Sequence, residues 1–469
     1  MDSLIPTETR EERRDDSLRT AVTPDPSILA REAEEQEPTI ATAPSDDPPD
    51  GGLTAWLTIM ASFLLNFVDL GFSYGFGVYQ EQYKLREFSD VSVTQIDLIG
   101  SICMALSLFL GAFMARPCQR FGMRAVAVLG SIILFVGTLS AGFCTSVPTL
   151  IVTQGIIQGA GAGILFIPGA AIPAQWFSKR RALAIGIGSS GAGLGGVFWS
   201  LVGRLLISRF GREWALRISA FVNLGLCAIA IIFLNERKTR ATRKEEGEKK
   251  EPILDRNMFR DPVFAVLYCG NGVSVFGYLV PFFYLPTFAS TRTGCTPFLA
   301  SLLLSMMNLG SAVGRIIFGA IADTRVGRFN TVLIGMAWAG ASQWLFWSLA
   351  NVRGSYGLSM VFAIVYGLCG GGYIGIFHVI LAHVFDPTRL AALTGLFFTS
   401  ELLGQTTGGP IAGAILQNTG EDWYPMIGYS GASLVMGALL GWMAKIMFER
   451  REKREREEGE KTEGRDGAA

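Results

Sequence analysis

Among the charged side chains inside long apolar stretches of the sequence, Arg315, Asp69 and Glu401 are the candidates for transport chemistry. Charged groups at membrane depth are costly to bury, so those that occur usually face a cavity or a partner. An arginine in such a place can bind an organic anion, and a carboxyl group there can carry a proton. Alternatively, either acid serves as a counter-charge for Arg315, and Asp69 as a neutral, hydrogen-bonded packing residue.

Uncharged polar residues in other apolar stretches could orient a bound ligand. Gln154 and Gln158 are four positions apart, so they share one face of a helix. Asn271, Tyr278 and Tyr373 stand in two later stretches. Hydrogen bonds between helices are the alternative role for each of the five.

The chain lacks the motifs of most other chemistries. It has no Walker phosphate loop, nucleophile elbow or metal-ligand spacing, its seven cysteines form no Cys-x-x-Cys pair, and it has only two histidines. We therefore expect no enzyme, no ATP-driven pump, no metal, no cofactor and no nucleic-acid partner.

The elements that would hold these residues are membrane helices. Half of the 469 residues are hydrophobic, and 17% are charged. Apolar runs long enough to cross the roughly 30 Å hydrocarbon layer recur twelve times. They lie at about 53–79, 93–114, 123–143, 149–172, 182–203, 214–234, 262–289, 297–321, 330–350, 356–381, 390–416 and 423–446.

The runs predict an all-α polytopic membrane protein with 12 helices in two six-helix bundles. The bundles would span residues 53–234 and 262–447, joined by a basic linker at 235–261. An acidic tail at 1–52 and a charged tail at 448–469 read as disordered.

Basic residues predict the orientation. If both tails are cytoplasmic, the inner segments hold 31 Lys and Arg, the outer segments hold 8, and Arg315 lies within a span. Cations are retained on the cytoplasmic side, so both termini are expected there.

The stretch Gln175–Gly196 combines three cations with six glycines. Lys179, Arg180 and Arg181 end the charged part, and the glycines follow within one apolar run. Small residues let membrane helices approach closely. The stretch therefore predicts a cytoplasmic loop leading into a tightly packed helix.

A short turn motif recurs about 205 residues along the chain. Residues 114–124 and 319–328 each place a glycine, Gly122 or Gly327, beside basic residues. Such an internal repeat indicates two related halves in parallel orientation, as in major facilitator transporters.

Three motifs carry a family resemblance: Asp50-Gly51-Gly52 with Trp56, Trp176-Phe177-x-Lys179-Arg180-Arg181, and Gly211-Arg212-Glu213-Trp214-Ala215-Leu216-Arg217. With these, the chain resembles the major facilitator superfamily and, within it, fungal members of the monocarboxylate-porter branch, over about residues 50–447. The resemblance implies a cavity lined by helices 1, 4, 7 and 10. It also implies that Arg315 binds a substrate carboxylate, and that Asp323, Arg325 and Arg328 take part in gating on the inner face.

The sequence departs from that branch at positions that bear on the substrate. No lysine occurs between Gly51 and Gln80, and Ser311 stands where an aspartate usually precedes the helix-8 arginine. Together with aromatic residues such as Phe72, Phe282 and Phe283, this suits a larger and more apolar solute than lactate or pyruvate.

The resulting hypothesis is a secondary transporter for a small organic anion or amphipathic metabolite, in the bilayer, driven by the solute's own gradient or by protons. Export of a secondary metabolite leads, with uptake of a monocarboxylate or vitamin-like nutrient as the alternative. A transporter-like sensor is a third hypothesis, disfavoured by the short tails. We expect a monomeric transport unit in the plasma membrane, with a vacuolar or vesicular membrane as the alternative.

Overall fold

The computed structural model describes residues 50–177, 181–237, 256–322, 324–384 and 396–466, all in one compact unit that starts at Pro48. Every regular element in these ranges is helical. The N-terminal tail up to residue 49 and the middle of the linker, 238–255, lie outside the described residues.

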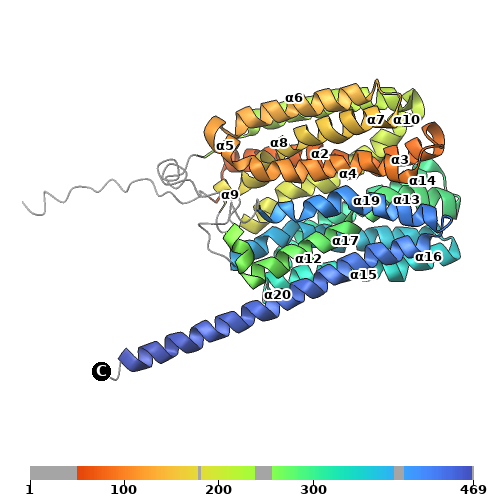
Figure 1. Ribbon diagram of the computed structural model, residues 1–469. Helices are drawn as coiled ribbons and strands as arrows, with labels where there is room; N and C mark the ends of the chain where they lie inside the picture. The colour runs from red at the N-terminus through yellow and green to blue at the C-terminus, as the bar shows by residue number, and fades with distance from the viewer. Residues whose placement is uncertain (1–49, 178–180, 238–255, 323, 385–395, 467–469) are drawn as a thin grey trace, which may run out of the picture. The chain divides into compact units, whose positions relative to one another are not determined.

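The first part of the chain forms α2 (Leu53–Tyr74), α3 (Phe76–Gln82), η1 (Tyr83–Glu87), α4 (Val93–Phe113), α5 (Ala115–Phe121), α6 (Met123–Ala141), α7 (Val147–Leu150), η2 (Ile151–Ile157), α8 (Gln158–Ala171), α9 (Pro173–Trp176) and α10 (Arg181–Phe233). The second part forms η3 (Arg256–Arg260), α12 (Pro262–Tyr278), α13 (Val280–Phe288), η4 (Ala289–Thr293), α14 (Pro297–Ala322), α15 (Arg328–Ser342), η5 (Gln343–Trp347), α16 (Ser348–Arg353), α17 (Tyr356–Val384), α19 (Glu401–Asn418) and α20 (Trp423–Asp466). Figure 1 shows these helices running side by side.

The predicted membrane crossings are confirmed. Ten helices of the described chain are long and apolar enough to cross a membrane. One of them, Leu183–Phe233, contains two predicted runs, which Gly211 separates with a positive φ of 79°. The eleventh run is represented by α19. The protein is thus an all-helical, multi-pass membrane protein with twelve helices in two six-helix bundles.

Glycines of α10 bring helices into backbone contact, as the sequence predicted. A Cβ at Gly191 would lie 2.1 Å from the carbonyl oxygen of Phe63 in α2. A Cβ at Gly193 would lie 2.7 Å from the backbone nitrogen of Ala312 in α14. Helix α10 therefore packs closely on α2 of its own half and on α14 of the other half.

The second half repeats this kind of packing between α12 and α19. A Cβ at Gly408 would lie 2.5 Å from the carbonyl oxygen of Phe276. The turn motif recurs in the backbone as well: Gly122 (φ 84°) precedes α6, and Gly327 (φ 79°) precedes α15. Glycine is suited to both places because it adopts positive φ without steric strain.

Two of the sequence motifs meet at one end of the bundle, which we call the Trp176 end. The backbone N–H of Asp50 donates to the carbonyl oxygen of Trp176 at 3.2 Å, and the rings of Trp56 and Phe177 lie edge to face at 5.5 Å. The indole N–H of Trp176 donates to Asn235 O at 2.9 Å. The entry motif, the helix-5 motif and the start of the linker thus hold one another.

The third motif fastens loops at the opposite end, which we call the Arg212 end. Buried Arg212 pairs with Glu87 at 2.6 Å and donates to Cys144 O at 2.8 Å. Arg217 donates to Gly142 O at 3.1 Å, and its guanidinium lies 3.9 Å from the centre of the Phe143 ring. The two arginines tie together three connections between helices.

We expect Arg212→Ala to destabilise the first half. The change removes the donor to the Cys144 carbonyl and the partner of Glu87, whose side chain is 25% exposed and can be hydrated instead. We therefore expect a loss of roughly 1–3 kcal/mol, from the carbonyl. Thermal unfolding of the purified protein in detergent measures the loss. Arg209→Ala, at an exposed position on the same helix, is the matched control and should leave the midpoint unchanged.

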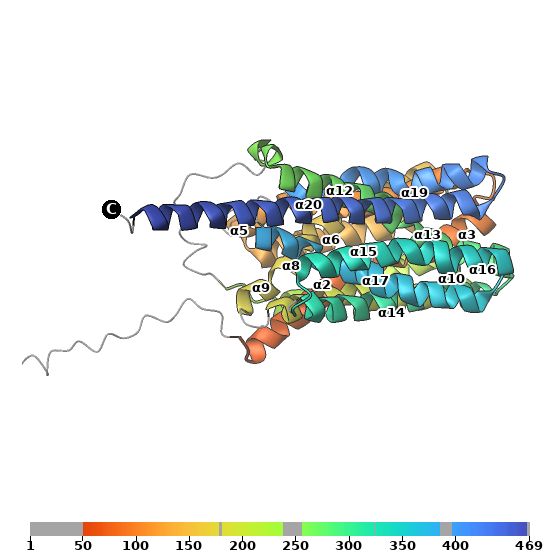
Figure 2. The ribbon, with the colours of Figure 1, turned by 90° about the horizontal axis from the view of Figure 1, so that it is seen from below.

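The C-terminal tail differs from the prediction of disorder, because α20 continues as one helix to Asp466 (Figures 1 and 2). Glu, Lys and Arg favour helix, and pairs four residues apart support it. Arg451 pairs with Glu455 at 3.0 Å and with Asp261 of the linker, also at 3.0 Å.

Candidate translocation site

Two membrane helices are interrupted at corresponding points. The first breaks between α2 and α3 at Gly75, and the seventh breaks between α12 and α13 at Leu279. The backbone angles match, with φ −79° and ψ −7° at Gly75 and φ −82° and ψ −15° at Leu279. Interrupted helices in equivalent positions of two repeats are the best sequence-level and structural indicator of a transporter's binding site.

Each interruption has a local cause. A Cβ at Gly75 would lie 3.0 Å from Cβ of Trp199, so only glycine allows this approach. In the seventh helix, Pro281 has no N–H to donate to the carbonyl of Gly277. The hydroxyl of Ser430 donates to that carbonyl instead, at 2.8 Å.

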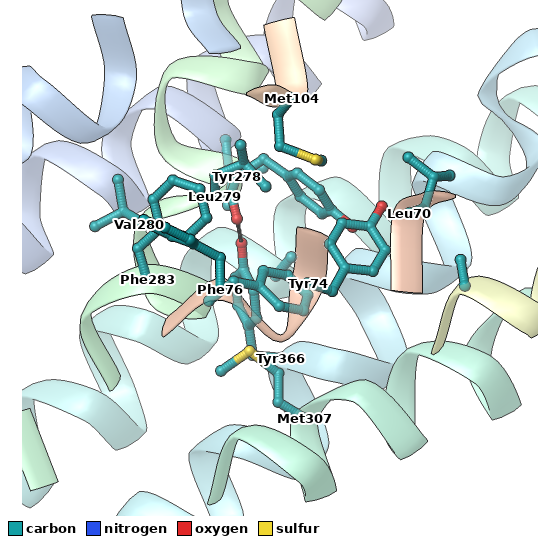
Figure 3. Close-up of a cluster of buried hydrophobic side chains, with 14 of the residues drawn as sticks. Leu70, Tyr74, Phe76, Met104, Tyr278, Leu279, Val280, Phe283, Met307 and Tyr366 are labelled. Atoms are coloured by element: carbon teal, nitrogen blue, oxygen red, sulfur yellow. Dashed lines mark hydrogen bonds between the residues drawn. The ribbon is translucent and has the colours of Figure 1, made fainter. Parts of the chain in front are cut away.

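Aromatic side chains fill the space between the two breaks (Figure 3). The rings of Tyr74 and Phe282 stack with centres 5.1 Å apart, and the Tyr278 ring lies 5.5 Å from Phe282. The Tyr366 hydroxyl donates to the backbone oxygen of Tyr278 at 2.7 Å. Tyr373 completes the group, edge to face with Tyr278 at 5.7 Å.

Arg315 reaches this aromatic group from α14. It is only 4% exposed, and it donates to the Ser189 carbonyl oxygen and to the Tyr74 hydroxyl, both at 3.2 Å. Its Nε has no hydrogen-bond partner in the described part of the chain. No carboxylate there lies within 4.0 Å of the guanidinium, so neither Asp69 nor Glu401 is its counter-charge in this conformation.

Glu401 is held at one side by Asn271. The Asn271 amide donates to Glu401 Oε1 at 3.1 Å and to the Ser400 hydroxyl at 3.0 Å, and all three residues are buried. This cluster joins α12 to the start of α19. The Glu401 carboxyl group therefore lies in the second half, hydrogen-bonded to the Asn271 amide.

Gln154 and Gln158 lie in the first half and line a small cavity of about 10 Å³ together with Ser73, Phe76 and Cys103. The Tyr83 hydroxyl donates to Gln154 at 2.8 Å, and the Thr138 hydroxyl donates to Gln158 at 3.2 Å. The π-helical segment η2 includes Gln154, and such segments often occur at functional sites.

Asp69 lies one turn of α2 before Ser73, which lines this cavity. It is buried, and the hydroxyl of Ser107 donates to its Oδ1 at 3.0 Å. The predicted site residues thus form two groups: Arg315, Tyr278 and Tyr373 with the Asn271–Glu401 pair, and Gln154 and Gln158 with Asp69.

Two of the predicted gating residues, Arg325 and Arg328, lie at the Trp176 end; Arg325 is exposed, and Arg328 is half-buried at the start of α15. The third, Asp323, is outside the described residues.

A polar network at the Arg212 end was not predicted from the sequence. Arg204 of α10 pairs with Glu81 of α3, and both are buried. From the second half, the Ser290 hydroxyl donates to Glu81, while Arg204 donates to Ser301 at 2.9 Å. A solvent-open recess of about 440 Å³ borders this network. The charges stand at the edges of apolar runs, where they resemble loop residues.

A second contact between the halves at this end involves Asp97 of α4. The Tyr284 hydroxyl of α13 donates to its Oδ2, and the Gln80 amide of α3 donates to its Oδ1 at 2.6 Å. Asp97 is fully buried. An acid inside the run at 93–114 was a visible signal, although no sequence feature pointed to its partners.

Comparison with known proteins supplies the family. The model of the Major Facilitator Superfamily matches residues 51–329 and 285–467. The chain belongs to the major facilitator superfamily. Members of this superfamily are transporters, which agrees with the interrupted helices and the site between the two bundles.

Several fungal transporters are similar over most of their length. The MFS-type transporter pynF of Aspergillus niger is 32% identical over 406 residues, which cover 86% of this chain and 91% of the relative. The fujikurins efflux protein of Gibberella fujikuroi is 27% identical, covering 92% of each chain. The aspyridones efflux protein apdF of Emericella nidulans is 29% identical, covering 86% of this chain and 80% of the relative.

Proposed function

We propose that this superfamily member exports an acidic, largely apolar secondary metabolite by alternating access. The observation that carries the proposal is Arg315, a buried cation without a carboxylate partner among the described residues, set against the aromatic rings at the two helix breaks. Such a pair of features suits a solute with one anionic group and an apolar body. The printed names of two relatives, efflux proteins for fujikurins and for aspyridones, support export.

In this proposal, the guanidinium binds the substrate carboxylate in place of Tyr74 and Ser189. Arginine presents paired N–H donors that match a carboxylate. The stacked rings of Tyr74 and Phe282 separate to admit the apolar body, with Tyr278 and Tyr373 around it. Gln154, Gln158 and Asn271 orient its polar groups.

Proton coupling is part of the proposal and is assigned to Asp69 and Glu401. Both acids are buried; Asp69 accepts a hydrogen bond from Ser107, and Glu401 accepts one from Asn271. Burial away from water favours the protonated form of a carboxyl group, which is what a proton carrier needs. Gating at the other end is assigned to Asp323, Arg325 and Arg328.

The membrane context is also proposed. The distribution of basic residues supports a cytoplasmic Trp176 end and an extracellular Arg212 end in the plasma membrane. The transport unit is a monomer with domains at 53–234 and 262–447. Within the superfamily, the three motifs support placement in the monocarboxylate-porter branch.

The test is flux in proteoliposomes with and without an imposed pH gradient. The panel contains short monocarboxylates, larger apolar acids and neutral analogues of the same apolar bodies. We expect transport of the larger acids, driven by protons moving in the opposite direction, and little transport of lactate or pyruvate. Empty liposomes and heat-inactivated protein give the background.

Two outcomes would contradict the proposal. Transport confined to short monocarboxylates, with protons moving in the same direction, would establish nutrient uptake. Equal transport of the neutral analogues would show that no carboxylate is recognised.

A further inference from the structure

Asp97 occupies a seat built by both halves of the protein. Its partners Gln80 and Tyr284 come from α3 and α13, and α19 closes the third side. A Cβ at Gly413 of α19 would lie 2.7 Å from Asp97 Oδ2 and 2.6 Å from the Tyr284 hydroxyl oxygen. A Cβ at 413 would press on the ends of both side chains, so glycine at this position of α19 suits the contact.

Within the described part of the chain, no cation pairs with Asp97 in this seat. The titratable or charged groups on the neighbouring elements are Tyr79 and Glu81 of α3, Tyr83, Lys84, Arg86 and Glu87 of η1, Tyr284 of α13, Glu401 at the far end of α19, and Cys103 of α4 itself. Lys84 donates to the carbonyl oxygens of Ser89 and Val91, and none of these groups forms an ion pair with Asp97. An ionised carboxylate buried without a cation is strongly disfavoured.

A neutral carboxyl group fits the seat with both of its oxygens hydrogen-bonded. The Tyr284 hydroxyl lies within bonding distance of both Asp97 Oδ2 and the carbonyl oxygen of Gly409, at 3.3 Å for the latter. The carbonyl can only accept, so the tyrosine proton can turn to Gly409 while the tyrosine oxygen accepts a proton from Asp97. Gln80 continues to donate to Oδ1.

Glu81 at the same end is different. It also contacts the second half, through Ser290, but Arg204 balances its charge. Closure of this contact therefore needs no proton. The two carboxyl groups make the same kind of cross-half contact and differ in whether a cation accompanies them.

We propose that Asp97 couples closure of the extracellular end to the uptake of one proton from outside. This rests on the proposed orientation and alternating-access function. When the halves separate at the Arg212 end, Tyr284, Gly409 and Gly413 leave Asp97, which becomes hydrated and releases its proton. Closure requires the proton to return from the external solution, so external acid favours the closed state.

Accessibility of an engineered cysteine tests this without a substrate. Leu304 of α14 is fully buried and packs on Gly77 of α3 across the junction of the halves. In a background without the seven native cysteines, Leu304→Cys is labelled with a membrane-impermeant maleimide in intact cells. One proton taken up on closure changes the closed-to-open ratio about tenfold per unit of external pH. Because the maleimide reacts with the thiolate, whose fraction itself rises with pH, each rate is divided by that of an exposed cysteine, Arg209→Cys, at the same pH. Labelling below means this ratio, and we expect it to rise with external pH.

Variants separate the roles of the groups. Asp97→Asn keeps the shape and is always neutral, so we expect slow labelling that no longer depends on pH. Gly413→Ala blocks the seat without touching the acid and should give fast labelling at every pH. Glu81→Gln should raise labelling overall while leaving its pH dependence intact.

Labelling of the reference protein that ignores external pH would overturn the proposal, as would a pH response that survives in Asp97→Asn. Because the readout needs no flux, a negative result here leaves the exporter proposal standing. A failed flux assay combined with the expected labelling would instead contradict the exporter proposal alone.

Discussion

Replacing Arg315 with alanine is expected to abolish transport of acidic substrates while leaving the fold intact. The guanidinium is buried, and its partners are a backbone carbonyl and a tyrosine hydroxyl rather than a carboxylate. Removing one partner of a buried, hydrogen-bonded charge pair costs about 2–5 kcal/mol. Apparent affinity for an anionic substrate should therefore fall by roughly 100-fold or more.

Two matched variants show whether the charge is responsible. Arg315→Lys keeps the charge but loses the paired N–H geometry, so we expect intermediate transport. Tyr74→Phe removes only the hydroxyl that Arg315 contacts and should change affinity by less than about tenfold. Flux is normalised to the amount of monodisperse protein. Undiminished flux of an acid in Arg315→Ala would show that another group binds the anion.

The helices could be predicted from the sequence because the bilayer leaves little choice. Backbone polar groups must be satisfied within each apolar run, so runs of suitable length become helices. The glycines of the fifth helix were informative for the same reason, and Gly191 and Gly193 do contact neighbouring backbones. Arg315 could be singled out because a lone cation in an apolar run needs a special environment.

The partners of these residues could not be predicted. Asp97 and Tyr284 are 187 positions apart, and their contact depends on how the two halves meet. Nothing in the sequence distinguishes Tyr74 from the other aromatic residues. Its contacts with Phe282 and Arg315 depend on the helix breaks at Gly75 and Leu279. Local sequence specifies each helix, whereas the site is made where helices of different halves touch.

The C-terminal tail shows the reverse failure. Its composition, with many charges and few apolar residues, is typical of disorder. The same charges alternate in sign at helical spacing, as in Arg451 with Glu455 and Lys453 with Glu457. Composition alone discards that spacing, which is why the helix was missed.

A set of glycine-to-alanine changes in α10 should separate folding from conformational change. At Gly191 the new Cβ would lie 2.1 Å from Phe63 O, within the first half. At Gly193 it would lie 2.7 Å from Ala312 N, in the other half. At Gly225 nothing lies within 4 Å, which makes it the control.

Gly191→Ala should lower stability, because α2 and α10 belong to one bundle and must be forced apart in every conformation. Overpacking typically costs about 1–3 kcal/mol, and thermal unfolding in detergent would show it.

Gly193→Ala raises the free energy only of conformations in which α10 touches α14, so the molecule can relieve the clash by separating its halves. We expect near-normal stability with transport reduced about tenfold, since a shift of about 1.4 kcal/mol between conformations suffices. Gly225→Ala should leave transport unchanged and raise helix stability slightly. Equal loss of stability at Gly191 and Gly193 would contradict the division into two moving halves, because the α10–α14 contact would then be a permanent part of the fold.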